Sequence, residues 1–382
     1  MPVLAPSSPG HYEVGMWQVE HRFHSQLPMA TVWAYGASQA TATTPGPTIE
    51  AVRGYPIDVR WSNHLPDRHL LAASVDTSLH MAHPARGIPT VVHLHGAETE
   101  PGSDGFPESW FTAEFAEKGP TWEKETYHYE NEQRSTLLWY HDHALGFMRL
   151  NIYAGLAGLY ILRDPANDPR TLPSGRYEIP LILQDRMFHA DGSLAYPTTG
   201  VNPDHPQWQP EFFGNVICVN GTAWPHLDVE PRRYRFRVVN ASGSRFYRLG
   251  VATEDPAWSE GPTIRQIGTD GGLLRKAVWI AGGPGRRNHA LLVAPAERAD
   301  VIVDFTGLPV GSRFVLTNDA ATPFPGGDPY CHISEHEDNE MMRPYQVVGA
   351  TVAKQASVAA TSGEEFLSLH EGGAPRAVTL VV

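Results

Sequence analysis

The sequence predicts an all-β protein made of two β-sandwiches in tandem, and three observations lead to this fold class. The 382 residues include 35 glycines and 33 prolines along the whole length, which favours a turn-rich β architecture over helical bundles. Short runs rich in Val, Ile, Tyr and Phe recur between these turn residues, and few segments show helical periodicity. Two of the runs resemble each other at a separation of roughly one domain.

Each predicted strand is an apolar or alternating run bounded by Gly, Pro, Asn or Asp. One helical candidate, ESWFTAEFAEKG at residues 108–119, is short and could equally be irregular. The predicted strands lie within residues 48–61, 90–96, 135–143, 155–164, 177–185, 234–242, 299–307 and 313–319.

The two similar runs are PIDVRWSN (56–63) and YRFRVVN (234–240), and both are alternating strands that end at an asparagine, Asn63 or Asn240. Repetition at this scale indicates two related β-sandwiches. The stretch DPANDPRTLPSG, which begins at Asp164, is typical of a linker between them. The two expected domains are therefore residues 1–164 and 165–320.

Composition excludes several partners. The net charge of −13, with no basic block to offset it, argues against binding to nucleic acid or to an anionic membrane. No run of about eighteen apolar residues predicts a membrane span. The N-terminal stretch MPVLAPSSPGHYEVGMW has no basic region followed by an apolar one, so we expect no signal peptide. Two cysteines cannot form a disulfide framework.

Two histidine pairs stand at the ends of apolar runs. His93 and His95 lie in VVHLHG, and His141 and His143 lie in LLWYHDH. Residues i and i+2 of a strand point to the same face, so each pair projects two imidazoles from one edge. Neutral imidazole is a common ligand of copper, zinc and iron. One such pair could consist of ordinary surface or hydrogen-bonded histidines, but two pairs favour a metal site.

A second cluster lies in YCHISEHEDNEMMRP (330–344), where Cys331, His336 and Met341 follow one another at equal spacing. Thiolate and imidazole with a weak axial thioether form the ligand set of a blue-copper site, whereas zinc has little use for methionine. His332 faces the other way from Cys331 in extended backbone and could bind another metal. The second cysteine, Cys218 in GNVICVNG, is expected to be a small buried apolar residue.

Long motifs around these clusters resemble the multicopper oxidases, specifically the bacterial branch of spore-coat laccase, bilirubin oxidase and phenoxazinone synthase. They include HLHG with SDGFPESWF, LWYHDHALGFMRLNIYAGLAGLYILRDP, VNGTAWPHLDVEPRRYRFRVVNAS, LLVAPAERADVIVDF and CHISEHEDNEMMRP. The resemblance implies cupredoxin-like Greek-key sandwiches, copper as the cofactor, and oxidation of phenols or aromatic amines with reduction of dioxygen to water. It also implies a mononuclear type 1 copper and a trinuclear type 2/type 3 cluster.

The resemblance also assigns roles to individual residues. Glu337 and Asp104 correspond to carboxylates that deliver protons to the cluster, although an Asp before Gly is also a common turn former. The copper ligands implied by the motifs are His93 for type 2, His95, His141, His143 and His332 for type 3, and Cys331, His336 and Met341 for type 1.

The sequence departs from the family pattern at its third ligand motif. No HPxHxHG segment is present, and Tyr330 stands where family members have a histidine before the cysteine. Five of the eight cluster imidazoles remain, and the type 1 site lacks one of its two. We therefore expect partial copper binding and little four-electron oxidase activity, with residues 321–350 as a remnant of a third cupredoxin-like domain and 351–382 as a poorly ordered tail.

Two other functions stay open. The chain could be a catalytically inactive two-domain remnant with a binding or coat-type structural role. A lone zinc or copper site could also be held by the two N-terminal histidine pairs alone. The absence of a predicted export signal fits the cytoplasm or a spore coat equally, and the pattern specifies neither the reducing substrate nor the oligomeric state.

Overall fold

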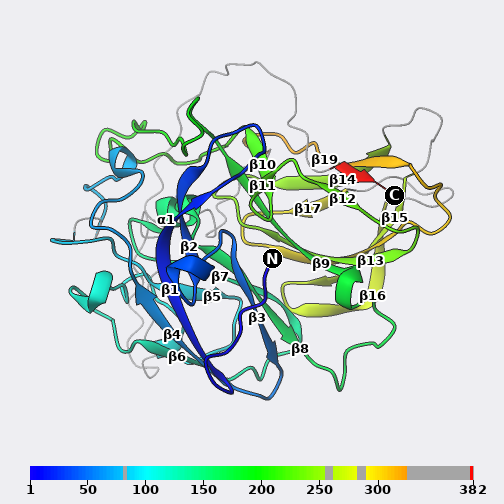
Figure 1. The fold of residues 1–382 in the computed structure, drawn as a ribbon, viewed down its shortest axis with the longest axis horizontal. Helices are drawn as coiled ribbons and strands as arrows, with labels where there is room; N and C mark the ends of the chain where they lie inside the picture. Colours follow the sequence, from blue (N-terminus) through cyan, green and yellow to red (C-terminus); the bar gives the residue numbers. More distant parts are fainter. Residues whose placement is uncertain (81–83, 254–260, 282–289, 325–378, 382) are drawn as a thin grey trace, which may run out of the picture.

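The computed structural model describes residues 1–80, 84–253, 261–281, 290–324 and 379–381, and this part of the chain is almost entirely β-structure, as predicted (Figure 1). It contains a single α-helix, α1 (Met148–Ala154), among the described residues. None of the helices in these ranges is long and apolar enough to cross a membrane. The short 3-10 helices are Gln39–Thr41, Ala72–Ser74, Pro101–Ser103, Ala113–Phe115 and Gly175–Tyr177.

The N-terminal sandwich consists of two four-stranded sheets. Aromatic side chains fill the space between them. The rings of Tyr35, Trp61 and Tyr140 pack edge to face or tilted, with centroids 5.0–5.8 Å apart. In order across the first sheet, the strands are β2 (Ala30–Gly36), β1 (His11–His21), β4 (Ile57–Asn63) and β6 (Thr126–Tyr129); across the second they are β3 (Gly46–Val52), β8 (Ala157–Arg163), β7 (Thr136–Asp142) and β5 (Val92–His95).

The C-terminal sandwich packs a seven-stranded sheet against a five-stranded one. Across the larger sheet the strands are β11 (Thr222–Ala223), β10 (Val216–Val219), β9 (Glu178–Arg186), β13 (Arg233–Asn240), β18 (Arg298–Asp304), β15 (Thr263–Thr269) and β16 (Gly272–Ala281). Across the smaller sheet they are β12 (His226–Asp228), β20 (Thr379–Val381), β19 (Arg313–Asn318), β14 (Tyr247–Thr253) and β17 (Leu291–Val293).

The two sandwiches repeat the same topology strand for strand. The order β2-β1-β4-β6 matches β10-β9-β13-β18, and β3-β8-β7-β5 matches β12-β20-β19-β14. Parallel pairing occurs at corresponding places in the two sandwiches. The parallel pair β1 and β4 corresponds to β9 and β13, and the parallel pair β3 and β8 corresponds to β12 and β20. The other matched pairs are antiparallel. The predicted tandem of related sandwiches is thus confirmed, with β11 and β15–β17 added in the second.

The matching asparagines perform the same task in both sandwiches. The Asn63 Oδ1 atom accepts the backbone N–H of Leu65 at 2.9 Å, and Asn240 Oδ1 accepts that of Ser242 at 3.0 Å. Their Nδ2 atoms donate to the carbonyls of Ile88 at 2.9 Å and of Arg245 at 2.7 Å. Each asparagine therefore ties the end of its strand to a neighbouring loop.

The helical candidate at residues 108–119 is not an α-helix. Phe111 instead forms isolated bridges with Thr90 and Lys118, and Glu114 and Phe115 take positive φ angles of 55° around a short 3-10 turn. The true helix, α1, was not predicted, because all seven of its residues are buried and it has no polar face to produce a periodic pattern. From the expected tail 351–382, the structure describes Thr379–Val381 as strand β20.

The two sandwiches share an apolar interface beneath the histidine-bearing strand β7. Leu137 and Trp139 of β7 belong to one buried cluster with Ile182 of β9 and Val239 of β13. Arg298, at the start of β18, crosses this interface and donates from Nε to the carbonyl oxygen of Leu137 at 3.2 Å. The second sandwich therefore supports the strand that carries His141 and leads into His143.

Candidate metal centre

Strand pairing brings the two histidine pairs together. In the antiparallel register of β5 and β7, His93 lies opposite His141 and His95 lies opposite Trp139. His143 follows the end of β7, and its backbone N–H donates to the Val91 carbonyl at 2.8 Å. Ring centroids of neighbouring imidazoles are 4.8–5.6 Å apart.

The geometry of the cluster is that of a nitrogen-only metal site. One ring nitrogen each from His93, His95 and His141 lies within 4.8 Å of the other two. The Nδ1 atom of His95 and the Nε2 atom of His141 are 3.3 Å apart. Two nitrogens bound tetrahedrally to one ion at about 2.0–2.1 Å are separated by about 3.3 Å, so the spacing of these two ring atoms fits a shared ion.

Backbone carbonyls orient three of the imidazoles. The Nδ1 atom of His93 lies 2.6 Å from the Asp104 carbonyl oxygen, that of His143 lies 3.1 Å from the Gly105 carbonyl, and that of His141 lies 2.8 Å from the Asp142 carbonyl. A carbonyl oxygen can only accept, so each Nδ1 carries the proton and each Nε2 carries the lone pair. This outer hydrogen bond is characteristic of metal-binding histidines.

The loop that carries Asp104 and Gly105 lies tightly against β5. Gly105 has a φ angle of +76°, and a Cβ atom on it would lie 2.0 Å from the Val92 carbonyl oxygen. Only glycine fits there, which explains the Asp-Gly pair in the sequence. The Asp104 carboxylate itself is 3.5 Å from His93 Nδ1 and its side chain is 31% exposed, so it lies between the cluster and solvent.

Asp142 lies between the two histidines of the HDH motif, and its side chain holds the surrounding backbone in place through hydrogen bonds. Its buried carboxylate accepts the backbone N–H groups of Val91 and Ala144, each at 3.1 Å, and the Nδ2 group of Asn151 at 2.8 Å. Asn151 Oδ1 in turn lies 3.1 Å from the Nε2 atom of the buried His69. The sequence analysis missed Asp142 and Gly105; an acidic residue between two candidate ligands was the available signal.

The cluster is largely shielded from water. The His141 and His143 residues are 1% and 4% exposed, and the side chain of His93 is the most accessible of the four at 14%. The Trp139 ring lies over His141 at a centroid distance of 4.1 Å and covers it toward the second sandwich. A largely buried set of imidazoles suits copper, zinc or iron and does not suit calcium or magnesium, which prefer oxygen ligands.

The second predicted cluster cannot be placed in the same way. Cys331, His332, His336, Glu337 and Met341 all lie outside the described residues. Cys218 is described and is buried on β10, where burial raises the pKa of its thiol to about 12. It is therefore an inert buried residue, in the apolar cluster that β10 shares with Phe23, Val32 and Leu150 of the N-terminal part of the chain.

Comparison with known proteins places this geometry in a family. Residues 85–167, which include all four histidines, match the family model described as multicopper oxidase. The chain is 43% identical over 377 residues to the multicopper oxidase LPR1 of Arabidopsis thaliana, covering 95% of this chain and 61% of that protein. It is 42% identical over 334 residues to a laccase of Bacillus subtilis, covering 86% of this chain and 60% of that protein. The chain belongs to the multicopper oxidase family.

Solved structures agree with this assignment. A variant of the multicopper oxidase McoA from Aquifex aeolicus superimposes with a TM-score of 0.62 at 27% identity, over 83% of this chain and 59% of that one. A laccase from Pediococcus acidilactici gives a TM-score of 0.62 at 25% identity, over 83% and 58%. This multicopper oxidase chain spans about three fifths of the length of these curated relatives. Copper is the cofactor that membership of this family implies.

Proposed function

We propose that this multicopper oxidase chain is a copper-dependent oxidoreductase of the laccase type, acting on phenols or aromatic amines with dioxygen as the electron acceptor. The observation that carries this proposal is the grouping of ring nitrogens from His93, His95 and His141, with the ring of His143 stacked on that of His93. The three fixed Nδ1 tautomers support it, because they present Nε2 lone pairs before any metal arrives.

Bound copper would supply one-electron redox chemistry, and the protein groups prepare the site for it. His93, His95, His141 and His143 would hold the metal, while Trp139 and the β7 interface exclude water from one side. Reduction of dioxygen consumes protons, and we propose that Asp104 brings them in. Its partly exposed carboxylate is next to His93, the most accessible of the four histidines. Glu337, beyond the described residues, is proposed as a second proton donor from its motif.

We further propose that turnover is limited by the number of ligands. The sequence supplies five of eight cluster imidazoles and lacks the HPxHxHG motif, so the expected outcome is partial copper loading with little four-electron activity. Cys331, His336 and Met341 would form a type 1 site with one imidazole missing. A loosely completed site binds metal weakly and in several geometries.

The test is copper reconstitution of the purified full chain. Bound copper is counted by elemental analysis, the type 1 site is followed by its blue absorption band, and oxygen consumption is measured with a phenolic substrate. His141→Gln should abolish most cluster binding, and His24→Gln, at a partly exposed histidine outside the cluster, is the matched control that should leave it unchanged. Absence of copper from the wild-type chain would reject the proposed site, and a strong blue band with steady oxygen consumption would reject the predicted low turnover.

A single-metal site is the second candidate, and the 4.8 Å grouping of three ligand atoms favours it. In this case zinc or copper is held by the N-terminal histidines without any contribution from Cys331. Cys331→Ser should then leave one equivalent of bound metal, whereas the copper-oxidase proposal predicts loss of the blue band and of part of the copper. A chain that binds no metal in either form would instead support a purely structural or binding role.

A further inference from the structure

The side chain of Asp142 lies on the core-facing side of its sheet, opposite to the imidazoles. It pairs with Val92 of the first sandwich core, and neighbouring residues of a strand point to opposite faces. Its carboxylate accepts two backbone N–H groups, one from Val91 before the first histidine pair and one from Ala144 after the second. The carboxylate thereby joins the two segments that carry the candidate ligands.

The second sandwich has the same arrangement at Asn318 of β19, which pairs with Leu249 of β14. The Asn318 Oδ1 atom accepts the backbone N–H of Arg248, one residue before the paired position, at 2.9 Å. It also accepts the backbone N–H of Ala320, two residues after Asn318, at 3.1 Å. Both offsets are the same as those around Asp142. The fold therefore requires only an acceptor oxygen at this position, and an amide is sufficient for it.

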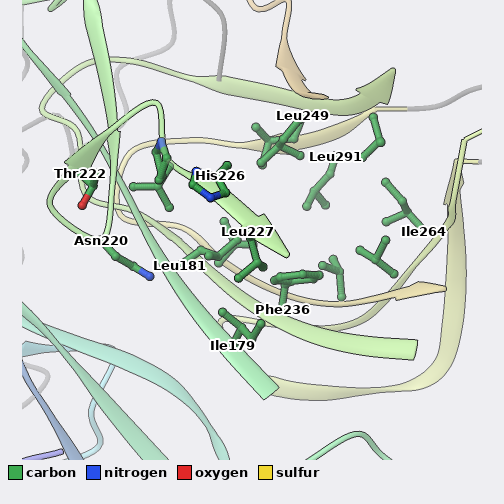
Figure 2. Close-up of a pocket in the computed structure, with 17 residues that line it drawn as sticks. Ile179, Leu181, Asn220, Thr222, His226, Leu227, Phe236, Leu249, Ile264 and Leu291 are labelled. Atoms are coloured by element: carbon green, nitrogen blue, oxygen red, sulfur yellow. The ribbon is translucent and has the colours of Figure 1, made fainter. Parts of the chain in front are cut away.

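Beyond these two bonds the sandwiches differ. Figure 2 shows Leu249 and Leu291 pointing into an apolar cavity of about 200 Å³ in the second sandwich. In the first sandwich, Asp142 accepts a third hydrogen bond, from the Nδ2 atom of Asn151 at 2.8 Å. Asn318 has no such side-chain donor within the described part of the chain. The third bond is thus an addition that the strand ends do not require.

Asn151 connects Asp142 to a buried histidine. It is fully buried on α1, and its Oδ1 atom lies 3.1 Å from the Nε2 atom of His69. The Nδ1 atom of His69 accepts the backbone N–H of Leu71 at 2.9 Å. Burial keeps this ring neutral, since it lowers the pKa of His69 from 6.5 to about 3. A neutral imidazole has one protonated nitrogen, so Nε2 donates to Asn151.

The direction of each hydrogen bond in this chain is fixed. The Asp142 carboxylate and the Pro89 carbonyl, 3.0 Å from Asn151 Nδ2, can only accept, so the Asn151 amide cannot flip. Its Oδ1 atom therefore needs the donor that His69 supplies. The His69 ring is itself held edge to face against Trp33, at 4.4 Å between centroids. Loss of His69 would leave a buried acceptor without a partner, beside the group that fixes the Asp142 carboxylate.

We propose that His69 and Asn151 are positioning residues of the metal site, which act through Asp142 on the segment that carries His141 and His143. The backbone carbonyl of Asp142 orients the His141 ring at 2.8 Å, so a shift of Asp142 moves a ligand directly. The inference rests on the proposed copper site for its affinity measurement, whereas the orientation of the rings can be measured on the metal-free protein.

Two substitutions of His69 separate its two hydrogen bonds. In His69→Gln the side-chain amide reaches the position of Nε2 and still donates to Asn151. In His69→Asn it reaches only the position of Nδ1 and accepts only from Leu71. Both variants should have a lower Tm. We expect His69→Asn to weaken copper binding about three- to tenfold and His69→Gln to stay within about twofold of the wild-type chain, as for the loss and the retention of one buried hydrogen bond.

Ring orientation is measured by the ring 15N shifts of histidine-labelled, metal-free protein, with His141→Gln and His143→Gln to assign the signals. Both rings should keep the Nδ1-protonated tautomer in His69→Gln and mix it with the other tautomer in His69→Asn. The matched control is Asn318→Ala, which removes the equivalent bonds of the second sandwich. It should lower Tm and leave copper affinity and ring shifts unchanged.

Equal copper affinities and ring shifts for the two His69 variants would overturn the proposal, and so would an equal effect of Asn318→Ala. A wild-type chain that binds no copper would instead reject the proposed function, and the ring shifts of the metal-free protein would still decide the positioning role. If His69→Asn does not fold, Asn151→Ser breaks the bond to Asp142 directly, and wild-type affinity and ring shifts in that variant would overturn the proposal.

Discussion

Substitution of Gly105 by alanine should damage the metal site through the backbone alone. The φ angle of +76° costs an L-residue about 1–2 kcal/mol, and the new Cβ would lie 2.0 Å from the Val92 carbonyl oxygen. Relief of this clash moves the loop away from β5, and with it the carbonyl oxygens that orient His93 and His143. Loss of such an outer partner typically lowers metal affinity 10- to 100-fold. We therefore expect Gly105→Ala to weaken copper binding by at least about tenfold.

The chain offers a matched control. Gly54 has the same φ angle of +76°, but nothing lies within 4 Å of its hypothetical Cβ atom. Gly54→Ala should therefore lower the free energy of unfolding by about 1–2 kcal/mol and leave copper affinity unchanged. Affinity is measured by competition with a copper chelator, and stability by urea unfolding of the metal-free protein. Equal copper affinities for Gly105→Ala and the wild-type chain would refute the role assigned to the loop.

Three further predictions follow from buried polar groups. Asp142→Asn turns an amide N–H toward groups that already donate hydrogen bonds. The substitution should therefore lower the free energy of unfolding, measured in urea, by about 1–3 kcal/mol and weaken copper binding. Unchanged values for both would show that the carboxylate is not needed. Burial lowers the pKa of His69 from 6.5 to about 3, so between these values only the unfolded chain binds the proton, and stability should fall by up to ~1.4 kcal/mol per pH unit as pH decreases. A His69→Gln variant should show a flatter urea-stability profile over that range. Arg298→Met leaves the Leu137 carbonyl without its partner across the sandwich interface and should lower Tm by several degrees in calorimetry.

Local patterns in the sequence were sufficient to predict the strands and the repeat. The alternating run that ends at Asn63 and its counterpart that ends at Asn240 are matching strands of two sandwiches, because alternation is a property of the strand itself. Helix α1 was missed for the opposite reason, since complete burial removed its periodicity. The candidate helix at 108–119 failed because Phe111 pairs with Thr90, a long-range contact that overrides local propensity.

The metal site shows the same division. The spacing of His93 and His95 placed two imidazoles on one edge, but the register that sets His93 opposite His141 depends on pairing between strands far apart in the sequence. Asp104 was predicted for its carboxylate, and the structure adds a direct role for its backbone carbonyl, which no side-chain pattern reveals. The need for glycine at position 105 arises because a side chain there would clash with the backbone of Val92. This contact exists only in the folded chain.

Closure of the second sandwich by β20 has a consequence for the order of folding. The first sandwich has all eight of its strands once residue 163 has been synthesised, whereas the second waits for residues 379–381. Ribosomal synthesis is vectorial, so β12 and β19 spend the intervening time with an uncovered edge that other nascent chains can pair with. The long separation between β19 and β20 also makes this contact entropically more costly than the one between β7 and β8. Slow synthesis through residues 319–378 should therefore prolong the interval in which newly made chains are prone to aggregate.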